Sequence, residues 1–357
     1  MKKLCVIFGG NSSEHDISII TGLQLCKNIE MKYDVEKVYL GLDNNFYLAT
    51  KFTDLKSFSD KEHLNLKQVY FLNGAIYKTG ILNSKVCDVD CVVNCCHGGV
   101  GECGDLAGFF EVLGIKYTSA NSLSSKIAMD KSLAKSILKN SVPTIKGVKV
   151  TKQNFENKVE FIKNEFSDNL IVKPNSLGSS IGVKCCDKED FTNQIEAIFE
   201  LKDDALVEER IVNIKEYNQA CFKTEKGLVL SVIEQVKTKS DFLTFEDKYQ
   251  GGKIKGNDRI IPAQISPELE EEIINYTSKI YKKLNLNGVV RIDYIFDQTN
   301  MKLYFNEVNT IPGSMAFYLY EPIGIDYITL VENLIENATV PKSYMYLSTD
   351  ILKNKNI

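Results

Sequence analysis

Two apolar-rich runs near the carboxy-terminal end of the chain carry polar residues that a hairpin would bring together. Runs 289–296 and 301–308 are separated by a turn-like polar stretch, so they predict a β-hairpin. Residues two apart on a strand share a face, which brings Asp293 on the first strand close to Glu307 and Asn309 on the second. Oxygen ligands of this kind suit Mg²⁺ or Mn²⁺ bound to a nucleotide. The alternative is a polar strand face that contacts only solvent.

The bulk composition limits the class of protein. A length of 357 residues predicts two or three domains, because a single core of that size is rare. A net charge of −4 gives no support to nucleic-acid binding. No run approaches the roughly 20 apolar residues of a membrane span, and the apolar run after the first lysines is too short for a signal peptide. We therefore expect a cytoplasmic protein without nucleic-acid or membrane partners.

Strand and helix patterns divide the chain into three predicted domains and a tail. Residues 1–118 alternate strands with helices, which predicts an α/β domain with a largely parallel sheet. Residues 119–212 contain one long helical pattern over 123–138 and two strands joined by a Gly/Ser-rich loop. Residues 213–345 contain further strands, the hairpin and an amphipathic helix, so this part is α+β. Residues 346–357 form a polar tail.

The loop of the central domain, KPNSLGSSIG over 173–182, is suited to phosphates. Its glycines let backbone N–H groups approach a ligand closely, Ser179 and Ser180 add hydroxyl donors, and Lys173 adds a cation. No Gly-Lys-Ser/Thr opens a helix after it, so the segment is not a Walker A motif. An ordinary hairpin connection is the alternative.

Three further motifs contain residues suited to a ligand. Glu14 follows the strand–glycine junction in GGNSSEHDIS, where a carboxylate suits an ammonium group, although a helix capping box is an alternative for this segment. His97 and Glu102 flank the glycines of HGGVGE after another strand, where an ordinary tight turn is the alternative. The long polar loop over 237–259 contains EDKY and predicts a lid over an active site.

Taken in order, six blocks resemble the D-alanine–D-alanine ligase family of ATP-grasp enzymes. The blocks are GGNSSEHDIS, HGGVGE, MDK, KPNSLGSSIG, EDKY and RID…NEVNTIPG, and the resemblance covers nearly the whole chain. It implies an ATP-grasp fold, in which an amino-terminal α/β domain precedes two domains that clasp ATP. It also implies two steps, in which ATP phosphorylates one D-alanine carboxylate and the amine of a second D-alanine then displaces phosphate. The product, D-alanyl-D-alanine, feeds peptidoglycan precursor synthesis, and homodimers are common in the family.

The resemblance also implies a role for each site residue. Glu14 would orient the ammonium of the first D-alanine and form a hydrogen-bonded triad with Ser179 and Tyr249. Arg291 and the backbone N–H of Gly313 would stabilise the tetrahedral oxyanion. Two ions, Mg²⁺ or Mn²⁺, would bind Asp293, Glu307 and Asn309. Roles in ATP binding fall to Lys131, Lys173, Ser180, Glu209, Glu216 and Lys248, and roles in substrate binding to Glu14, His97 and Tyr318.

Two positions depart from the family pattern. Cys103 stands where the family has an acid. Tyr318 stands where many members have a serine that meets the carboxylate of the acceptor, so D-serine is the second candidate acceptor after D-alanine. Ligases that use D-lactate carry histidine in the lid motif, and Tyr249 therefore favours an amino-acid acceptor. Another ATP-grasp dipeptide ligase with an altered acceptor pocket is the remaining alternative.

Overall fold

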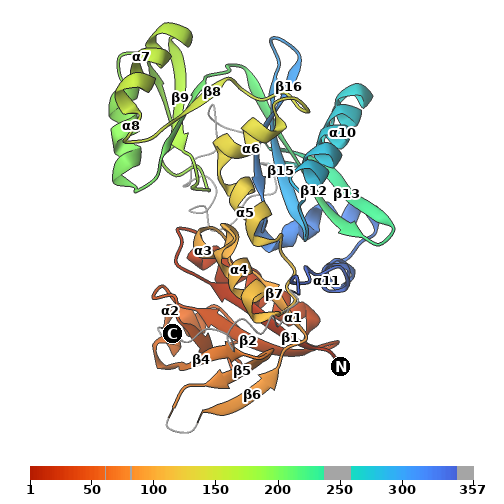
Figure 1. Cartoon of the computed structure of the whole chain (residues 1–357). Helices are drawn as coiled ribbons and strands as arrows, with labels where there is room; N and C mark the ends of the chain where they lie inside the picture. Colours follow the sequence, from red (N-terminus) through yellow and green to blue (C-terminus); the bar gives the residue numbers. More distant parts are fainter. Residues whose placement is uncertain (61, 81–82, 237–258, 344–357) are drawn as a thin grey trace, which may run out of the picture.

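Three β-sheets organise the part of the chain that the structure describes, one in the amino-terminal part and two in the rest (Figure 1). The computed structural model describes residues 1–60, 62–80, 83–236 and 259–343. The strands are β1 (Lys3–Gly9), β2 (Asp34–Leu40), β3 (Phe46–Leu48), β4 (Lys67–Leu72), β5 (Ala75–Lys78), β6 (Ser84–Asp88), β7 (Cys91–Asn94), β8 (Gly147–Val150), β9 (Asn169–Pro174), β10 (Lys184–Asp187), β11 (Ala205–Glu209), β12 (Ile214–Thr224), β13 (Gly227–Val236), β14 (Arg259–Ile260), β15 (Val290–Asp297) and β16 (Lys302–Asn309). The helices are α1 (His15–Ile29), α2 (Lys56–Ser59), α3 (Gly99–Glu102), α4 (Asp105–Leu113), α5 (Ser122–Met129), α6 (Lys131–Leu138), α7 (Phe155–Glu165), α8 (Phe191–Glu200), α10 (Pro267–Lys283) and α11 (Tyr327–Glu336), with short 3₁₀ segments η1 (Glu62–Asn65), η3 (Gly313–Leu319) and η4 (Glu321–Ile323). Within the described residues, no helix has the length and apolarity needed to cross a membrane.

The amino-terminal sheet has the strand order β6-β5-β4-β3-β2-β1-β7. β1 runs parallel to β2 and to β7, and the remaining neighbours pair antiparallel. The predicted parallel arrangement thus holds at the centre of this domain, around β1. Most of the antiparallel pairs join strands that are consecutive in the chain and separated by only a few residues. A parallel pair would need a long crossover connection instead. The apolar run of β1 is buried almost throughout, as a central parallel strand requires.

The two remaining sheets are antiparallel and lie on either side of a cavity. The four-stranded sheet has the order β10-β9-β11-β8, and helices α7 and α8 pack with it. The five-stranded sheet has the order β14-β13-β12-β15-β16. Helix α10 covers its outer face, where Ile273 and Ile280 are fully buried in one cluster with Ile292 of β15 (Figure 1).

The helical pattern predicted over 123–138 proves to be two helices, α5 and α6. Asp130 breaks the pattern because its backbone is extended, with ψ of 97°, and its carboxylate caps α6 by accepting a hydrogen bond from the Leu133 N–H at 2.9 Å. Ala128 of α5 and Ala134 of α6 share a buried cluster with the five-stranded sheet. The break therefore lets both helices follow the surface of that sheet.

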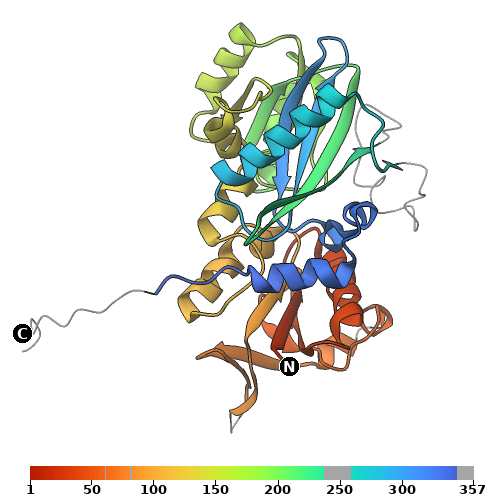
Figure 2. The same cartoon turned by 90° about the vertical axis from the view of Figure 1, so that its right-hand side faces the viewer.

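Helix α11 returns the described chain to the amino-terminal part (Figure 2). Its Leu330 and Val331 are fully buried and share a cluster with Leu23 of α1 and Phe222 of β12. This common core joins the amino-terminal sheet to the five-stranded sheet, so residues from both can contribute to one site.

Helix α1 packs very closely on β1, and this packing predicts the effect of one substitution. A Cβ atom on Gly22 would lie 2.5 Å from the side chain of Phe8, which is fully buried. Gly22→Ala should therefore destabilise the protein by about 1–3 kcal/mol through overpacking, even though alanine favours a helix over glycine by roughly 1 kcal/mol. Chemical denaturation measures this change.

Gly108→Ala in α4 is the matched control, because its new Cβ would lie 3.5 Å from Ser122, an ordinary contact. It should be neutral or stabilising. Equal denaturation midpoints for the two variants would contradict the close packing of α1 on β1.

Candidate active site

A cavity lies between the four-stranded and five-stranded sheets. Its lining comes from β9 and the loop after it on one side, and from β12, β13, β15 and β16 on the other. Glu14 reaches it from the amino-terminal part, just before α1. The predicted site residues in this lining are Glu14, Lys131, Lys173, Ser179, Ser180, Glu216, Arg291, Asp293, Glu307 and Asn309. The fold therefore brings most of the predicted site together from segments far apart in the sequence.

The predicted hairpin is confirmed as β15 and β16, which pair antiparallel. Asp293 lies directly opposite Glu307, and Arg291 lies opposite Asn309. The Arg291 guanidinium donates from Nε to Asp293 Oδ1 at 2.8 Å and from Nη2 to Oδ2 at 3.0 Å. The Asn309 amide donates to the same Oδ2 at 3.1 Å. Both carboxylate oxygens of Asp293 are therefore fixed by their neighbours, which orients this side chain in the cavity.

The predicted metal ligands are thus two carboxylates and one amide oxygen. No group of three or more His, Cys, Asp or Glu side chains is placed to hold a metal ion within the described residues. The predicted set does not rest on such a group, because Asn309 supplies its third oxygen. Hard oxygen donors that leave positions open are nevertheless the set expected for a cation shared with phosphates.

Two lysines beside the cavity share one buried carboxylate that the sequence analysis did not identify. Glu208 of β11 lies 2.8 Å from Lys173 Nζ and also pairs with Lys135 of α6. All three are buried, with Glu208 only 1% exposed. Burial alone would raise the pKa of Glu208, but the two lysines outweigh it and lower this pKa to about 2. Lys135 lies four residues after Lys131, on the same helix face, and this spacing could have identified Lys135 as a second lysine near the site.

The two lysines respond differently to burial. Burial lowers the pKa of Lys135 to about 8, although Glu208 opposes the change. Burial also acts to lower the pKa of Lys173, but Glu208 and Glu307 outweigh it and raise this pKa. Lys173 is therefore a fixed cation, and its Nζ also donates to Asn306 Oδ1 of β16 at 3.1 Å. This contact links the two sheets across the cavity.

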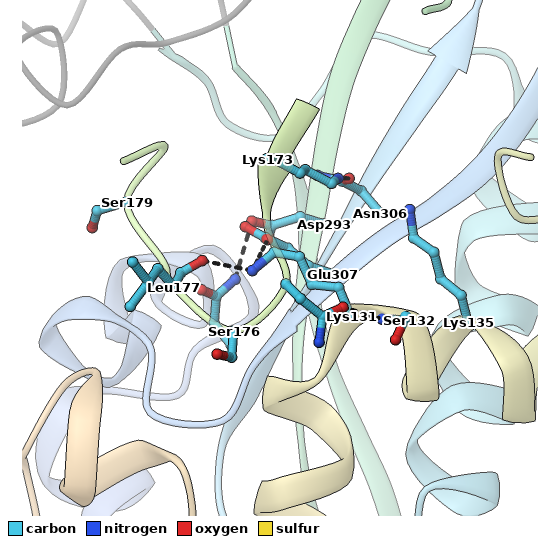
Figure 3. A network of polar contacts seen from close by, with 12 residues as sticks. Lys131, Ser132, Lys135, Lys173, Ser176, Leu177, Ser179, Asp293, Asn306 and Glu307 are labelled. Atoms are coloured by element: carbon cyan, nitrogen blue, oxygen red, sulfur yellow. Dashed lines mark hydrogen bonds and ion pairs between the residues drawn. The ribbon is translucent and has the colours of Figure 1, made fainter. Parts of the chain in front are cut away.

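Lys131 is not the solvated helix residue that its sequence context alone would suggest. It is 7% exposed, and its Nζ donates to the carbonyl of Leu177 at 2.6 Å (Figure 3). The same Nζ lies 3.4 Å from Glu307 Oε2. Lys131 thus joins the Gly/Ser loop to Glu307, one of the predicted metal ligands.

The Gly/Ser loop approaches the amino-terminal part through Ser179. The Ser179 hydroxyl donates to Glu14 Oε1, and a Cβ on Gly178 would lie 3.2 Å from Glu14 Oε2. Ser179 and Ser180 both adopt left-handed backbone conformations, with φ of 55° and 58°. Such strain in non-glycine residues is typical of loops held in shape for a ligand. Two members of the predicted triad are therefore in contact.

His97 lies behind the cavity and does not line it. Its Nδ1 is 2.5 Å from the carbonyl of Ile311 and its Nε2 is 2.8 Å from the Thr21 hydroxyl. A carbonyl can only accept, so Nδ1 carries the proton in this arrangement. Burial lowers the pKa of His97, which favours the neutral ring. The imidazole thus holds the segment after β16 against α1.

Glu102 makes a second tie between the same two parts. It accepts hydrogen bonds from the backbone N–H groups of Gly98 at 3.0 Å, Thr310 at 2.7 Å and Ile311 at 3.1 Å. Burial raises its pKa to about 7, with a further contribution from Glu14. Sequence reasoning singled out the motif, but it gave no sign that this carboxylate would bind the chain two hundred residues later.

Three other predicted residues lie away from the lining of the cavity. Glu209 pairs with Lys146, with 3.0 Å between Oε1 and Nζ. Gly313 begins η3, after the short segment that follows the hairpin. The Tyr318 hydroxyl donates to Glu234 Oε2 at 3.2 Å, and Glu234 does line the cavity. Tyr318 is therefore connected to the site through one carboxylate.

The predicted lid residues Lys248 and Tyr249 lie outside the described residues. Cys103, the other departure from the family pattern, is half-buried, and its Sγ donates to Asp105 Oδ2 at 3.2 Å. It does not contribute to the lining of the cavity.

Known protein families match this chain in its amino-terminal and carboxy-terminal parts. The family model described as D-ala D-ala ligase N-terminus matches residues 3–120, and the one described as D-ala D-ala ligase C-terminus matches residues 138–336. A D-alanine–D-alanine ligase of Campylobacter jejuni subsp. jejuni is 33% identical over 347 residues, which are 97% of this chain and 97% of the relative. One from Thermosipho africanus is 34% identical over 342 residues, which are 93% of this chain and 92% of the relative.

Two solved structures are similar throughout. The D-alanine–D-alanine ligase from Helicobacter pylori gives a TM-score of 0.78 at 28% identity, covering 96% of this chain and 100% of the other. The VanG D-Ala:D-Ser ligase from Enterococcus faecalis gives 0.80 at 29% identity, covering 94% of this chain and 98% of the other. These similarities confirm the predicted ATP-grasp fold. With both family models matched and relatives aligned over nearly its whole length, the chain belongs to the D-alanine–D-alanine ligase family.

Proposed function

We propose that this chain is an ATP-dependent ligase that joins two D-alanine molecules through a D-alanyl phosphate. One observation carries the proposal. A single cavity gathers a carboxylate suited to an ammonium group (Glu14), cations suited to phosphates (Lys131 and Lys173) and an arginine suited to developing negative charge (Arg291). Activation of a carboxylate by ATP and its capture by an amine need all three functions in one place.

ATP would occupy the space between the two antiparallel sheets. Lys131 and Lys173 would neutralise its phosphates, and Ser180 and the backbone N–H groups of the Gly/Ser loop would add hydrogen bonds. Glu216 lines the same cavity and suits the ribose or adenine donors. The nucleotide roles of Glu209 and Lys248 remain predictions.

The residues of the hairpin fit a divalent cation. Asp293 and Glu307 face each other across the strand pair, and Asn309 is hydrogen-bonded to Asp293, so three oxygen-bearing side chains share one face. We assign them to two Mg²⁺ or Mn²⁺ ions bound with ATP. When bound, such ions supply charge neutralisation at the transferred phosphoryl group.

The protein residues would position the reacting groups. Glu14 would hold the ammonium of the donor D-alanine. A carboxylate oxygen of this D-alanine would attack the γ-phosphorus of ATP, and ADP would leave. The acceptor amine would then attack the acyl carbon and lose a proton as inorganic phosphate departs. Arg291 and the N–H of Gly313 would stabilise the tetrahedral oxyanion. Tyr249 would complete the triad with Glu14 and Ser179. His97, predicted to lie near the substrate carboxylate, lies behind the cavity instead and would act only by positioning the segment after β16.

D-alanine is the proposed acceptor and D-serine the second candidate. The similarity to VanG, named as a D-Ala:D-Ser ligase, supports D-serine as the second candidate. We also propose a cytoplasmic location, where ATP and peptidoglycan precursors occur, a homodimer, and domain boundaries near residues 118 and 212.

Product analysis tests the function directly. With ATP, Mg²⁺ and D-alanine, we expect phosphate release and a D-alanyl-D-alanine product identified by mass. Added D-serine should give a minor mixed dipeptide, and added D-lactate should give no depsipeptide. A predominant mixed dipeptide would move the assignment to the second candidate. Phosphate release that does not depend on D-alanine would contradict the proposal.

Arg291→Ala should lower kcat by about 10²–10³, the loss expected when an oxyanion donor is removed. ATP affinity should change only a few fold, because the lysines that face the phosphates are retained. Steady-state kinetics and nucleotide titration separate the two effects. Arg291→Lys is the control that keeps the charge but loses the paired hydrogen bonds to Asp293, so it should recover only part of the activity. Wild-type turnover in the alanine variant would contradict the role of Arg291.

A further inference from the structure

A row of polar side chains crosses the floor of the cavity away from the phosphate-facing lysines. In the five-stranded sheet Glu307 pairs with Asp293, Asp293 pairs with Asn218, and Asn218 pairs with Glu234. Directly paired residues share a face of a sheet, and all four line the cavity. Two strand spacings separate Asp293 from Glu234, which is roughly 10 Å. The row thus runs from the metal site to the neighbourhood of Tyr318.

Two oxygens at this end of the row are buried without a hydrogen bond to any described residue. They are Asn218 Oδ1 and Glu234 Oε1, in residues that are only 5% and 1% exposed. Buried polar atoms are nearly always paired in folded proteins. Both residues line the cavity, and Glu234 Oε1 has an ion pair with Arg259 as its charged partner. This end of the cavity is therefore lined by polar groups suited to a polar ligand.

The hydroxyl of Tyr318 is not free to bind a carboxylate. Its proton is donated to Glu234 Oε2 at 3.2 Å. Burial and the nearby Glu234 raise the pKa of Tyr318, so the hydroxyl stays protonated and keeps this bond. A hydroxyl whose single proton is already donated can only accept a hydrogen bond. A ligand carboxylate also can only accept, so the two groups cannot bond to each other. Another residue must therefore supply the donors.

Arg259 has those donors in the right place. Its Nη1 lies 3.1 Å from Glu234 Oε1 as an ion pair without hydrogen-bond alignment, and its guanidinium lies 5.2 Å from the centre of the Tyr318 ring. It lines the cavity, and its side chain keeps 31% of its exposure. A guanidinium has five N–H donors, and none makes a hydrogen bond to another described residue.

The amino-acid usage of the chain supports a specific role for this side chain. The chain has only three arginines, Arg210, Arg259 and Arg291, and uses lysine elsewhere. Two of the three line the cavity. Arginine differs from lysine in presenting a planar fork that matches a carboxylate with two parallel hydrogen bonds.

We propose that Arg259 binds the carboxylate of the acceptor amino acid, with Glu234 and Tyr318 as the residues that position it. This inference rests on the proposed ligase function and identifies the acceptor as an α-amino acid with an unblocked carboxylate. Glu234 fixes one edge of the guanidinium and Tyr318 supports its face, which leaves the remaining N–H groups for the ligand. The acceptor amine would then lie toward Arg291, where the acyl group is activated.

A competition between two acceptors tests the proposal. D-alanine and D-alanine amide are supplied together with ATP and Mg²⁺, and the ratio of D-alanyl-D-alanine to its amide is measured by mass. The amide has no carboxylate, so it can act only as an acceptor. Arg259→Gln should lower this ratio on the order of tenfold to one-hundredfold, the effect of losing a charge-assisted hydrogen-bonded pair. Arg210→Gln, the same change at a residue outside the cavity lining, should leave the ratio unchanged.

Hydroxylamine provides a readout of the donor half alone. It attacks the acyl phosphate, releases phosphate and gives D-alanine hydroxamate without needing a carboxylate site. Arg259→Gln should form hydroxamate at a rate within about threefold of wild type, because a substitution that leaves the donor half of the site intact should have only a small effect. Equal losses of hydroxamate and dipeptide, or an unchanged acceptor ratio, would overturn the role of Arg259.

Tyr318→Phe separates the two candidate donors. It removes the hydroxyl but keeps the ring beneath the guanidinium, so the acceptor ratio should fall less than in Arg259→Gln. A larger fall in Tyr318→Phe would overturn the proposal and return the acceptor contact to the tyrosine. Wild-type protein that forms hydroxamate but no dipeptide would overturn the acceptor assignment, whereas the absence of both products would overturn the ligase function and this inference with it.

Discussion

Burying two lysines beside a ligand cavity requires a counter-charge, and Glu208 supplies it. The carboxylate joins Lys135 of α6 to Lys173 of β9, and Lys173 reaches across to Asn306 of β16. A charge buried alone would be strongly unfavourable, so each member of this network depends on the others. The network holds the two antiparallel sheets at the separation that forms the cavity. It also holds cationic groups beside the space where a triphosphate would lie.

A second set of contacts determines what faces those cations. His97, in the loop after β7, and Glu102, the last residue of α3, both bind the backbone of the segment that follows the hairpin. That segment leads from Asn309 to Gly313, while Glu14 lies at the neighbouring edge of the amino-terminal sheet and contacts Ser179. Groups on the two sides of the cavity thus come from different parts of the chain but occupy fixed relative positions. Buried backbone contacts of this kind give the precision that positioning two substrates requires.

Local patterns predicted the hairpin well, because a period of two places Asp293 and Glu307 on one face whatever the rest of the chain does. The partners of the lysines were harder to predict from the sequence. Glu208 and Glu209 are adjacent, and only the register of β11 decides that the first is buried between lysines while the second pairs with Lys146 near the surface. The ion pair of Arg259 and Glu234 likewise depends on strand pairing, which a single sequence does not reveal.

The most direct test of this account follows an oxygen atom. D-alanine labelled with ¹⁸O in both carboxylate oxygens is converted with ATP and Mg²⁺, and the released phosphate is analysed by mass. If the donor carboxylate attacks the γ-phosphorus in this cavity and the acceptor amine then expels phosphate, each phosphate should carry one ¹⁸O atom and the nucleotide product should be unlabelled ADP. Unlabelled phosphate accompanying dipeptide formation, or label found in AMP, would contradict activation through an acyl phosphate.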